Sequence, residues 1–399
     1  MKSKNRIPWL HEVNSENFCR FIFFVFVLSL SGCSIDVSPP STSGPPVAIT
    51  TEPGINSTPA STALSLPTRG IPEQNAPVIP SPNAGKVPIL WSSLDLSGTL
   101  IYTAADNTVA TLQVQSLNLA TGDLRTIFQL PPGGWADGAV VSPDHKTLLI
   151  AYSPPMTAPY GGLQSIYTLS MDSSGPLEVL ITPPTEHDQY LQPVWSPDGK
   201  YVYFAHINYE TMATFEIMRM AYPDGSPEKV VGDAYWPRVS DDNTLLAYVA
   251  LNPDTGVNQL SLANADGSDA HPIPVSGLLV PEIVDVPMVS PDNDSILFSS
   301  PTAINAFVPN WTDKLFGVDV AHADGSLASD WWSVPVSGGK AKQLTNIELL
   351  ALYGAYSPDR KHIASFSSNG IFVMKPDGTE LTMIVKDVGG IVGTVNWLP

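Results

Sequence analysis

Short polar turns, each followed by a strand-like run of β-branched and aromatic residues, recur along the chain from Ser93 onward. Five copies share one plan and read VVSPDHKTLLIAY from Val140, VWSPDGKYVYFAH from Val194, RVSDDNTLLAYVA from Arg238, MVSPDNDSILFSS from Met288 and AYSPDRKHIASFS from Ala355. A degenerate copy, SLDLSGTLIYTA, begins at Ser93. Proline presets φ in such a turn, aspartate hydrogen-bonds the backbone ahead of it, and glycine or asparagine accepts positive φ. The pattern therefore predicts a β-turn and then a strand in every copy.

A second hairpin signal follows each copy, made of a strand, a short turn of Asp, Ser or Gly residues and a return strand. Examples are FEIMRMAYPDGSPEKVV from Phe215 and GIFVMKPDGTELTMIV from Gly370. The anchor positions of the copies are Asp95, Ser142, Ser196, Ser240, Ser290 and Ser357, spaced 47, 54, 44, 50 and 67 residues apart. Units of four strands and about 40–50 residues, repeated in series, are typical of a β-propeller. We therefore predict an all-β fold with a six-bladed β-propeller over residues 87–399.

The C-terminal run Gly393–Pro399 indicates how the ring closes. Trp397 stands in the place that Trp195 holds before its own turn, so the run matches the first strand of a blade. Pairing with the first blade would close the ring and leave no exposed sheet edge. The segment Val87–Trp91 competes for the same place, and a ring of seven blades is the alternative.

The turns resemble the SPDG-type, WD-repeat-like blades of TolB-like propellers, and the likeness covers roughly residues 87–399. The motif is specific for the architecture and nearly silent about function, because many unrelated proteins use it. The resemblance implies protein–protein interaction at the cell envelope as a first functional hypothesis.

The N-terminus has the pattern of a secretory signal. Residues 1–20 carry a net positive charge, Phe21–Leu30 is an apolar run, and Ser31-Gly32-Cys33 follows. This ending resembles the lipobox of bacterial lipoproteins, in which the chain is cut before the cysteine and the thiol is acylated. We therefore predict a lipoprotein signal peptide at 1–32 and lipidation at Cys33. The protein would be extracytoplasmic and lipid-anchored, to the cell membrane or the outer membrane. An ordinary secretory signal is the alternative.

Residues 33–86 are predicted to be a disordered linker. Between Ser34 and Gly85, 25 of 52 residues are Ser, Thr or Pro, and such a stretch cannot bury enough apolar surface to offset its ordering entropy. The two cysteines are Cys19, in the segment to be removed, and Cys33. The processed domain would therefore have no disulfide.

Composition and missing motifs argue against several classes of function. The formal charge of −19 with only 19 Lys and Arg argues against a nucleic-acid partner, because phosphate contacts need cationic side chains. The sequence contains no G-x-S-x-G, H-E-x-x-H or C-x-x-C motif, and its histidines lie in separate repeats. We expect no cofactor, no metal site and no catalytic residues. The aspartates of the SPDG turns are interpreted as turn architecture.

Candidate binding residues lie where the connections vary in length. We letter the four strands of each repeat A to D in chain order. The turns between A and B and between C and D are short and uniform. The B–C and D–A connections open on the other face and include Ser153–Gly162, Thr182–Gln192 and Ser300–Asp330. Long ordered insertions are often functional. The candidates are Tyr160, His187, Asp188, Tyr190, His206, Trp311, Phe316 and His322. We interpret Trp195, Trp236 and Trp397 as packing residues, with Trp331 and Trp332 facing opposite sides of a strand.

These features favour a membrane-anchored propeller that works as a binding or scaffold module of the envelope. Its partner would be an envelope protein or a small ligand or glycan. The alternative is a carbohydrate- or peptide-active enzyme with a site in the propeller funnel, built from residues such as Asp137, His187 and His206. An enzyme would need titratable groups converging from several blades, and such groups are sparse.

Overall fold

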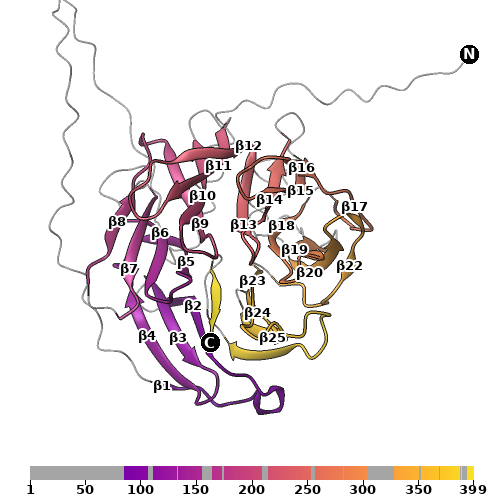
Figure 1. The fold of residues 1–399 in the computed structure, drawn as a ribbon. Helices are drawn as coiled ribbons and strands as arrows, with labels where there is room; N and C mark the ends of the chain where they lie inside the picture. The colour runs from indigo at the N-terminus through magenta and orange to yellow at the C-terminus, as the bar shows by residue number, and fades with distance from the viewer. Residues whose placement is uncertain are drawn as a thin grey trace, which may run out of the picture. The chain divides into compact units, whose positions relative to one another are not determined.

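The computed structural model describes residues 85–399 apart from 107–110, 133, 155–163, 173–174, 209–213, 253–256, 282, 303–327, 350–351, 368, 387 and 389–392. These described residues form β-strands and connections, with one short 3-10 turn, η1 (Ser92–Leu94). Six sheets of four or five strands are arranged as blades around a ring (Figure 1). The prediction of an all-β, six-bladed propeller is confirmed.

Each blade is an antiparallel sheet whose strands A to D follow one another outward from the ring centre. The A strands of blades 1 to 6 are β27 (Val395–Leu398), β5 (Trp135–Val141), β9 (Asp188–Trp195), β13 (Ala234–Val239), β18 (Asp285–Val289) and β23 (Tyr353–Tyr356). The B strands are β2 (Thr99–Asp106), β6 (Thr147–Ser153), β10 (Tyr201–Asn208), β14 (Leu245–Leu251), β19 (Ser295–Pro301) and β24 (Ile363–Ser367). The C strands are β3 (Thr111–Asn118), β7 (Ser165–Ser170), β11 (Thr214–Ala221), β15 (Asn258–Asn264), β20 (Ser329–Pro335) and β25 (Gly370–Met374). The D strands are β4 (Asp123–Gln129), β8 (Glu178–Ile181), β12 (Glu228–Gly232), β16 (His271–Pro272), β22 (Lys342–Gln343) and β26 (Thr382–Lys386).

The A strands of neighbouring blades contact one another all the way around, from β27 through β5, β9, β13, β18 and β23 back to β27. Two further pairings lie at outer edges. The strand β1 (Gly85–Lys86) pairs with β4 at the outer edge of blade 1. The strand β17 (Val275–Ser276) pairs in parallel with β21 (Gly339–Lys340) and joins the end of blade 4 to blade 5.

Ring closure follows the C-terminal prediction. The strand β27 pairs antiparallel with β2, with Trp397 opposite Leu100, in the same relation that Trp195 has to Val202 in blade 3. The competing segment takes another place, because Val87 N donates to Gly122 O and the ring nitrogen of the buried Trp91 donates to Leu119 O at 2.8 Å. The first blade is therefore built from both ends of the propeller sequence, and the alternative of seven blades is wrong.

The repeated A–B turns share one hydrogen-bond network. In each, the buried serine hydroxyl donates to the aspartate two residues later and accepts the backbone N–H five residues later. The serine–aspartate pairs are Ser142–Asp144, Ser196–Asp198, Ser240–Asp242, Ser290–Asp292 and Ser357–Asp359, with O···O distances of 2.6–2.7 Å. The residue after each aspartate has positive φ, and it is His145, Gly199, Asn243, Asn293 or Arg360. The interpretation of these aspartates as turn architecture is therefore confirmed.

Neighbouring A–B turns are also joined to one another. Asn293 donates to the Asp242 carboxylate at 2.8 Å, and the backbone N–H of Asp198 donates to the Asn243 side chain at 3.3 Å. Across the ring, Arg360 forms an ion pair with Asp241 at 3.3 Å. The face that carries the A–B turns is thus held together by contacts among the turns themselves.

Acid should weaken these turns. The serine hydroxyl is the largest cause that lowers the pKa of all five turn aspartates, to about 2 for Asp198 and Asp242. A carboxylate whose folded pKa lies below its unfolded value stabilises the fold above the unfolded pKa. That stability is lost as the pH falls from about 4 toward 2. We expect the urea midpoint to drop across this range.

The variant Ser240→Ala provides the control for the acid prediction. It removes the hydroxyl that is the largest cause of the low Asp242 pKa, so its urea midpoint should depend less on pH than that of the wild type. An identical slope in both proteins would assign the acid sensitivity to groups outside the turns.

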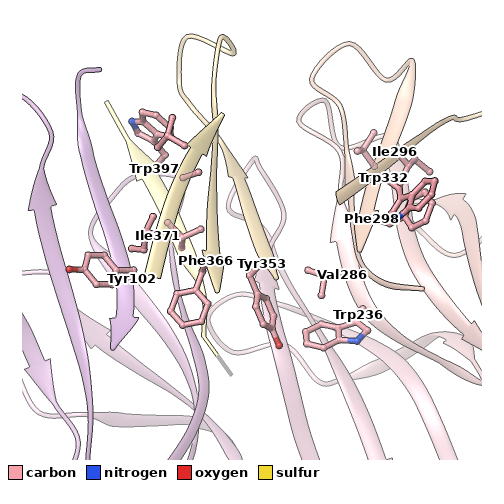
Figure 2. Close-up of a cluster of buried hydrophobic side chains, with 14 of the residues drawn as sticks. Tyr102, Trp236, Val286, Ile296, Phe298, Trp332, Tyr353, Phe366, Ile371 and Trp397 are labelled. Atoms are coloured by element: carbon pink, nitrogen blue, oxygen red, sulfur yellow. The ribbon is translucent and has the colours of Figure 1, made fainter. Parts of the chain in front are cut away.

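The core lies between the blades, because side chains alternate between the two faces of each sheet. Trp331 and Trp332 of β20 illustrate this. Trp331 packs beside Ile363 and Met374 of blade 6, whereas Trp332 belongs to the cluster drawn in Figure 2, together with Phe298. The other tryptophans interpreted as packing residues, Trp195, Trp236 and Trp397, are each 8% exposed. These predictions are confirmed.

Candidate functional site

The two faces of the ring differ in their connections. One face holds the A–B and C–D turns, and the other holds the B–C and D–A connections. In blade 3 the D–A connection ends at Asp188, where β9 begins, and the B–C connection starts after Asn208, where β10 ends. Several of the predicted binding residues meet at this end of blade 3.

Two predicted boundaries need correction. The sequence pattern predicts a connection at Asp188 and Tyr190, but both belong to β9 and are buried, at 3% and 5% exposed. The limits of the longest insertion, Ser300 and Asp330, are paired strand residues of β19 and β20. In both places the contacts that bury a polar residue come from distant parts of the sequence, so the local pattern favours a loop where the structure has a strand.

The Asp188 carboxylate accepts four hydrogen bonds. Its Oδ1 accepts from His206 Nε2 at 2.9 Å and from Asn208 Nδ2 at 2.7 Å. Its Oδ2 accepts from the backbone N–H of Thr185 at 3.1 Å and from the Thr185 hydroxyl at 2.6 Å. The carboxylate therefore joins the D–A connection to the strands β9 and β10. Burial alone would raise the pKa of Asp188, but hydrogen bonds from Thr185, Asn208 and His206 outweigh it and lower the pKa.

His206 is held from several sides. Its Nε2 faces Asp188, and its Nδ1 lies 3.5 Å from Glu216 on the neighbouring strand β11. Glu216 in turn forms an ion pair with Lys229 of β12 at 3.3 Å. The Tyr190 ring packs edge-on against the imidazole, with ring centroids 5.4 Å apart. Both ring nitrogens of His206 therefore face carboxylates.

This arrangement is better suited to holding the D–A connection in place than to catalysing a reaction. With four donors around it, the Asp188 carboxylate has no remaining site for a metal or a substrate hydrogen bond. His206 is only 14% exposed along its side chain. The neighbouring His187 is different, because its side chain is 45% exposed and lies 3.6 Å from Glu186. Of the predicted residues in this cluster, His187 is therefore the one that an external partner would reach.

The other predicted site residues lie outside the described part of the chain. They are Cys33, Tyr160, Trp311, Phe316 and His322, together with the side chain of Asp137. The enzyme hypothesis joined Asp137 to His187 and His206. Among the described residues, no group of three or more His, Cys, Asp or Glu side chains is placed to hold a metal ion. A search of the same residues finds no helix with the length and apolar character needed to span a membrane.

Three contributors to the cluster were not predicted, namely Thr185, Asn208 and Glu216. Asn208 and His206 are two residues apart on β10, so both point to the same face of the sheet as Phe204. Where a polar residue stands on the strand face that the apolar residues occupy, it is expected to be buried and to need a polar partner. The partner itself could not be read from the sequence, because it lies on another strand.

Comparison with known proteins shows the fold. No protein-family model matches the sequence, and no curated protein sequence matches it either. Among solved structures, TolB from Acinetobacter baumannii is similar, with 16% identity, a TM-score of 0.55, and coverage of 76% of this chain and 67% of that one. The nidogen/laminin complex contains a chain with 10% identity and a TM-score of 0.51, with coverage of 75% of this chain and 98% of that one. The chain therefore has the TolB-like propeller fold that the turns predict.

Proposed function

We propose that this propeller is a protein-binding module of the cell envelope, held outside the cytoplasm by a lipid on Cys33. The observation that carries the proposal is the difference between the two faces of the ring. The hydrogen-bonding groups of the A–B turns are used within their own Ser–Asp pairs and in contacts between turns. The opposite face carries the described ends of the variable connections and the exposed His187. We expect the contact residues Tyr160, Trp311, Phe316 and His322 to belong to the same face.

The cluster below this face supports a binding role. A carboxylate with four donors holds the D–A connection of blade 3 against its strands, which keeps His187 on a rigid base. Pre-organised contact residues lose less conformational entropy when a partner binds. One of the similar structures is of a complex, that of nidogen with laminin. Aromatic side chains beside polar ones, as in the insertion between β19 and β20, are the usual composition of protein contact sites.

The lipid anchor is tested by Cys33→Ala. Wild-type protein should incorporate an alkyne-labelled fatty acid and stay in the membrane fraction through salt and carbonate washes. The variant should incorporate none, because acylation needs the thiol, whereas Cys19→Ala, which changes the other cysteine, should be labelled like the wild type. Two or more acyl chains hold a protein stably on a bilayer. Wild-type protein without label would overturn the lipid anchor, and label retained in Cys33→Ala would place the lipid elsewhere.

The contact face is tested by replacing Trp311 and Phe316 with alanine. We expect an unchanged melting temperature and loss of the partner band after cross-linking on whole cells, since interface anchors contribute about 1 kcal/mol or more each. The control pair Ile89→Ala and Leu90→Ala removes apolar side chains that are 40% and 68% exposed in blade 1. It should leave the band in place. A large fall in melting temperature, with the band retained, would assign Trp311 and Phe316 to the core and end this part of the proposal.

A further inference from the structure

The centre of the ring is lined by equivalent residues of the A strands. These residues stand four positions before the turn serine, or before Leu398, which takes the place of that serine in blade 1. In the order of blades 2 to 6 and then blade 1, they are Gly138, Gln192, Trp236, Val286, Tyr353 and Thr394. Five of these six surround a cavity in the central channel that Arg238 also lines. The space is about 20 Å³, which is room for one water molecule or an ion of similar size. The A strand that carries Arg238 has a register shift between Tyr235 and Arg238, and Trp236 there has a φ of 55°.

Among the described residues that line the cavity, Arg238 is the only cation. The equivalent positions, two residues before the turn, are Val140, Val194, Met288, Ala355 and Asn396. Burial lowers the pKa of the Arg238 guanidinium, with Tyr353 opposing the shift, yet arginine stays protonated at any physiological pH. Within the described residues the guanidinium has neither an ion pair nor a side-chain hydrogen bond, and no described carboxylate lines the cavity.

A second donor in the same cavity also lacks an acceptor. The indole Nε1 of Trp236 is buried and has no hydrogen-bond partner among the described residues. Figure 2 shows Trp236 beside Tyr353 and Val286, and its ring packs against Tyr353 with centroids 5.3 Å apart. Tryptophan and arginine side chains can only donate hydrogen bonds. The Trp236 indole is buried and the Arg238 side chain is partly buried. Leaving such donors unpaired is costly, so the group that is missing is an acceptor with negative charge.

We propose that the central channel binds a small monovalent anion, a halide or a carboxylate group, between Arg238 and the Trp236 indole. A carboxylate would form the usual bidentate pair of hydrogen bonds with the guanidinium. A halide would accept one hydrogen bond from the guanidinium and one from the indole. The channel is then a ligand site separate from the connections proposed above to bind a protein, since it is built from the A strands alone.

The test uses the whole processed protein in a buffer that contains neither chloride nor small carboxylates, at constant ionic strength. Chloride and acetate are added separately, and the Trp236 indole N–H resonance, assigned with Trp236→Phe, is followed together with the melting temperature. We expect the resonance to shift and the melting temperature to rise with saturation, as binding to the folded state requires. A response to chloride alone identifies a halide site, and a response to acetate alone a carboxylate site. No response to either means that water fills the cavity and overturns the proposal.

The variant Arg238→Met removes the charge and keeps most of the volume. It should lose at least tenfold in anion affinity. Its melting temperature without anion should be no lower than that of the wild type, because an unpaired, partly buried charge is gone. Arg360→Met is the matched control, as Arg360 lies on the exposed turn face, and it should respond like the wild type. An anion response that persists in Arg238→Met would move the site away from the channel. Should this variant fail to fold, the wild-type titration still decides.

Discussion

Removal of residues 394–399 should abolish the folded ring. These residues include β27, which is the A strand of blade 1 and pairs with β2. Val395 and Trp397 are buried in the largest core cluster. Without the strand, β2 has an unpaired edge facing the ring centre, and such edges promote aggregation. We expect a loss of cooperative unfolding in urea and aggregated species by size-exclusion chromatography.

The strand also ties blade 1 to blade 2. The Thr394 hydroxyl accepts from Ala139 N at 2.9 Å and donates to Ala139 O at 2.7 Å. The Asn396 amide donates to Ala139 O at 2.8 Å and accepts from Val141 N at 3.2 Å. Replacing a buried Trp by Ala costs about 3–5 kcal/mol, and whole domains are stable by only about 5–15 kcal/mol. Trp397→Ala alone should therefore remove much of the free energy of unfolding of the ring.

The matched control is removal of the chain through Lys86. It takes away β1, a two-residue strand at the outer edge of the same blade whose residues are exposed. We expect little change in the urea midpoint from this deletion. A protein lacking 394–399 that unfolds at the wild-type midpoint as a monomer would show that β27 is dispensable for the ring.

The architecture could be predicted because each turn is encoded locally. A serine, an aspartate two residues on and a residue with positive φ lie within four consecutive positions, as in Ser196–Gly199. Such a turn forms without reference to distant residues. Closure could be predicted for the same reason, since Trp397 repeats the local context of Trp195.

The candidate site was only partly predictable, because its contacts join separate strands. The pairing of Asp188 with His206 spans 18 residues, and nothing near Asp188 in the sequence indicates that it begins a strand. Arg238 shows a second reason. Period-two alternation assigns each strand residue to a face, but the register shift between Tyr235 and Arg238 resets that assignment. Sequence alternation therefore could not place Arg238 in the channel.

Asp330→Ala should be among the most destabilising single substitutions in the propeller. Asp330 begins the exit from the longest connection and is fully buried in β20, opposite Ser300. Its Oδ1 accepts from the Thr345 hydroxyl at 2.8 Å and from the Ile347 backbone N–H at 2.6 Å. Its Oδ2 accepts from the Thr302 hydroxyl at 2.7 Å. Within the described residues it has no cationic partner, so these three donors alone stabilise the buried charge.

Alanine would leave all three donors without their acceptor. Hydrogen bonds to charged groups contribute about 1.5–3 kcal/mol each, and removing one member of a buried charged network costs about 3–5 kcal/mol. We expect a loss of that size in the free energy of unfolding measured in urea. Asp330→Asn keeps one acceptor oxygen and the side-chain volume, so its loss should be intermediate.

The control variant Asp377→Ala tests whether burial, and not hydrogen bonding alone, makes the loss of Asp330 costly. Asp377 also accepts from a threonine, with both N–H and hydroxyl of Thr379 bound to its Oδ1 at 2.9 and 2.6 Å, but it lies in an exposed turn of blade 6. Water can replace its contacts, and we expect a smaller loss of stability than for either Asp330 variant. The predicted order of destabilisation is Asp330→Ala, then Asp330→Asn, then Asp377→Ala. Equal losses for Asp330→Ala and Asp377→Ala would mean that water reaches Asp330, and that the strands flanking the longest connection are not held by a buried carboxylate.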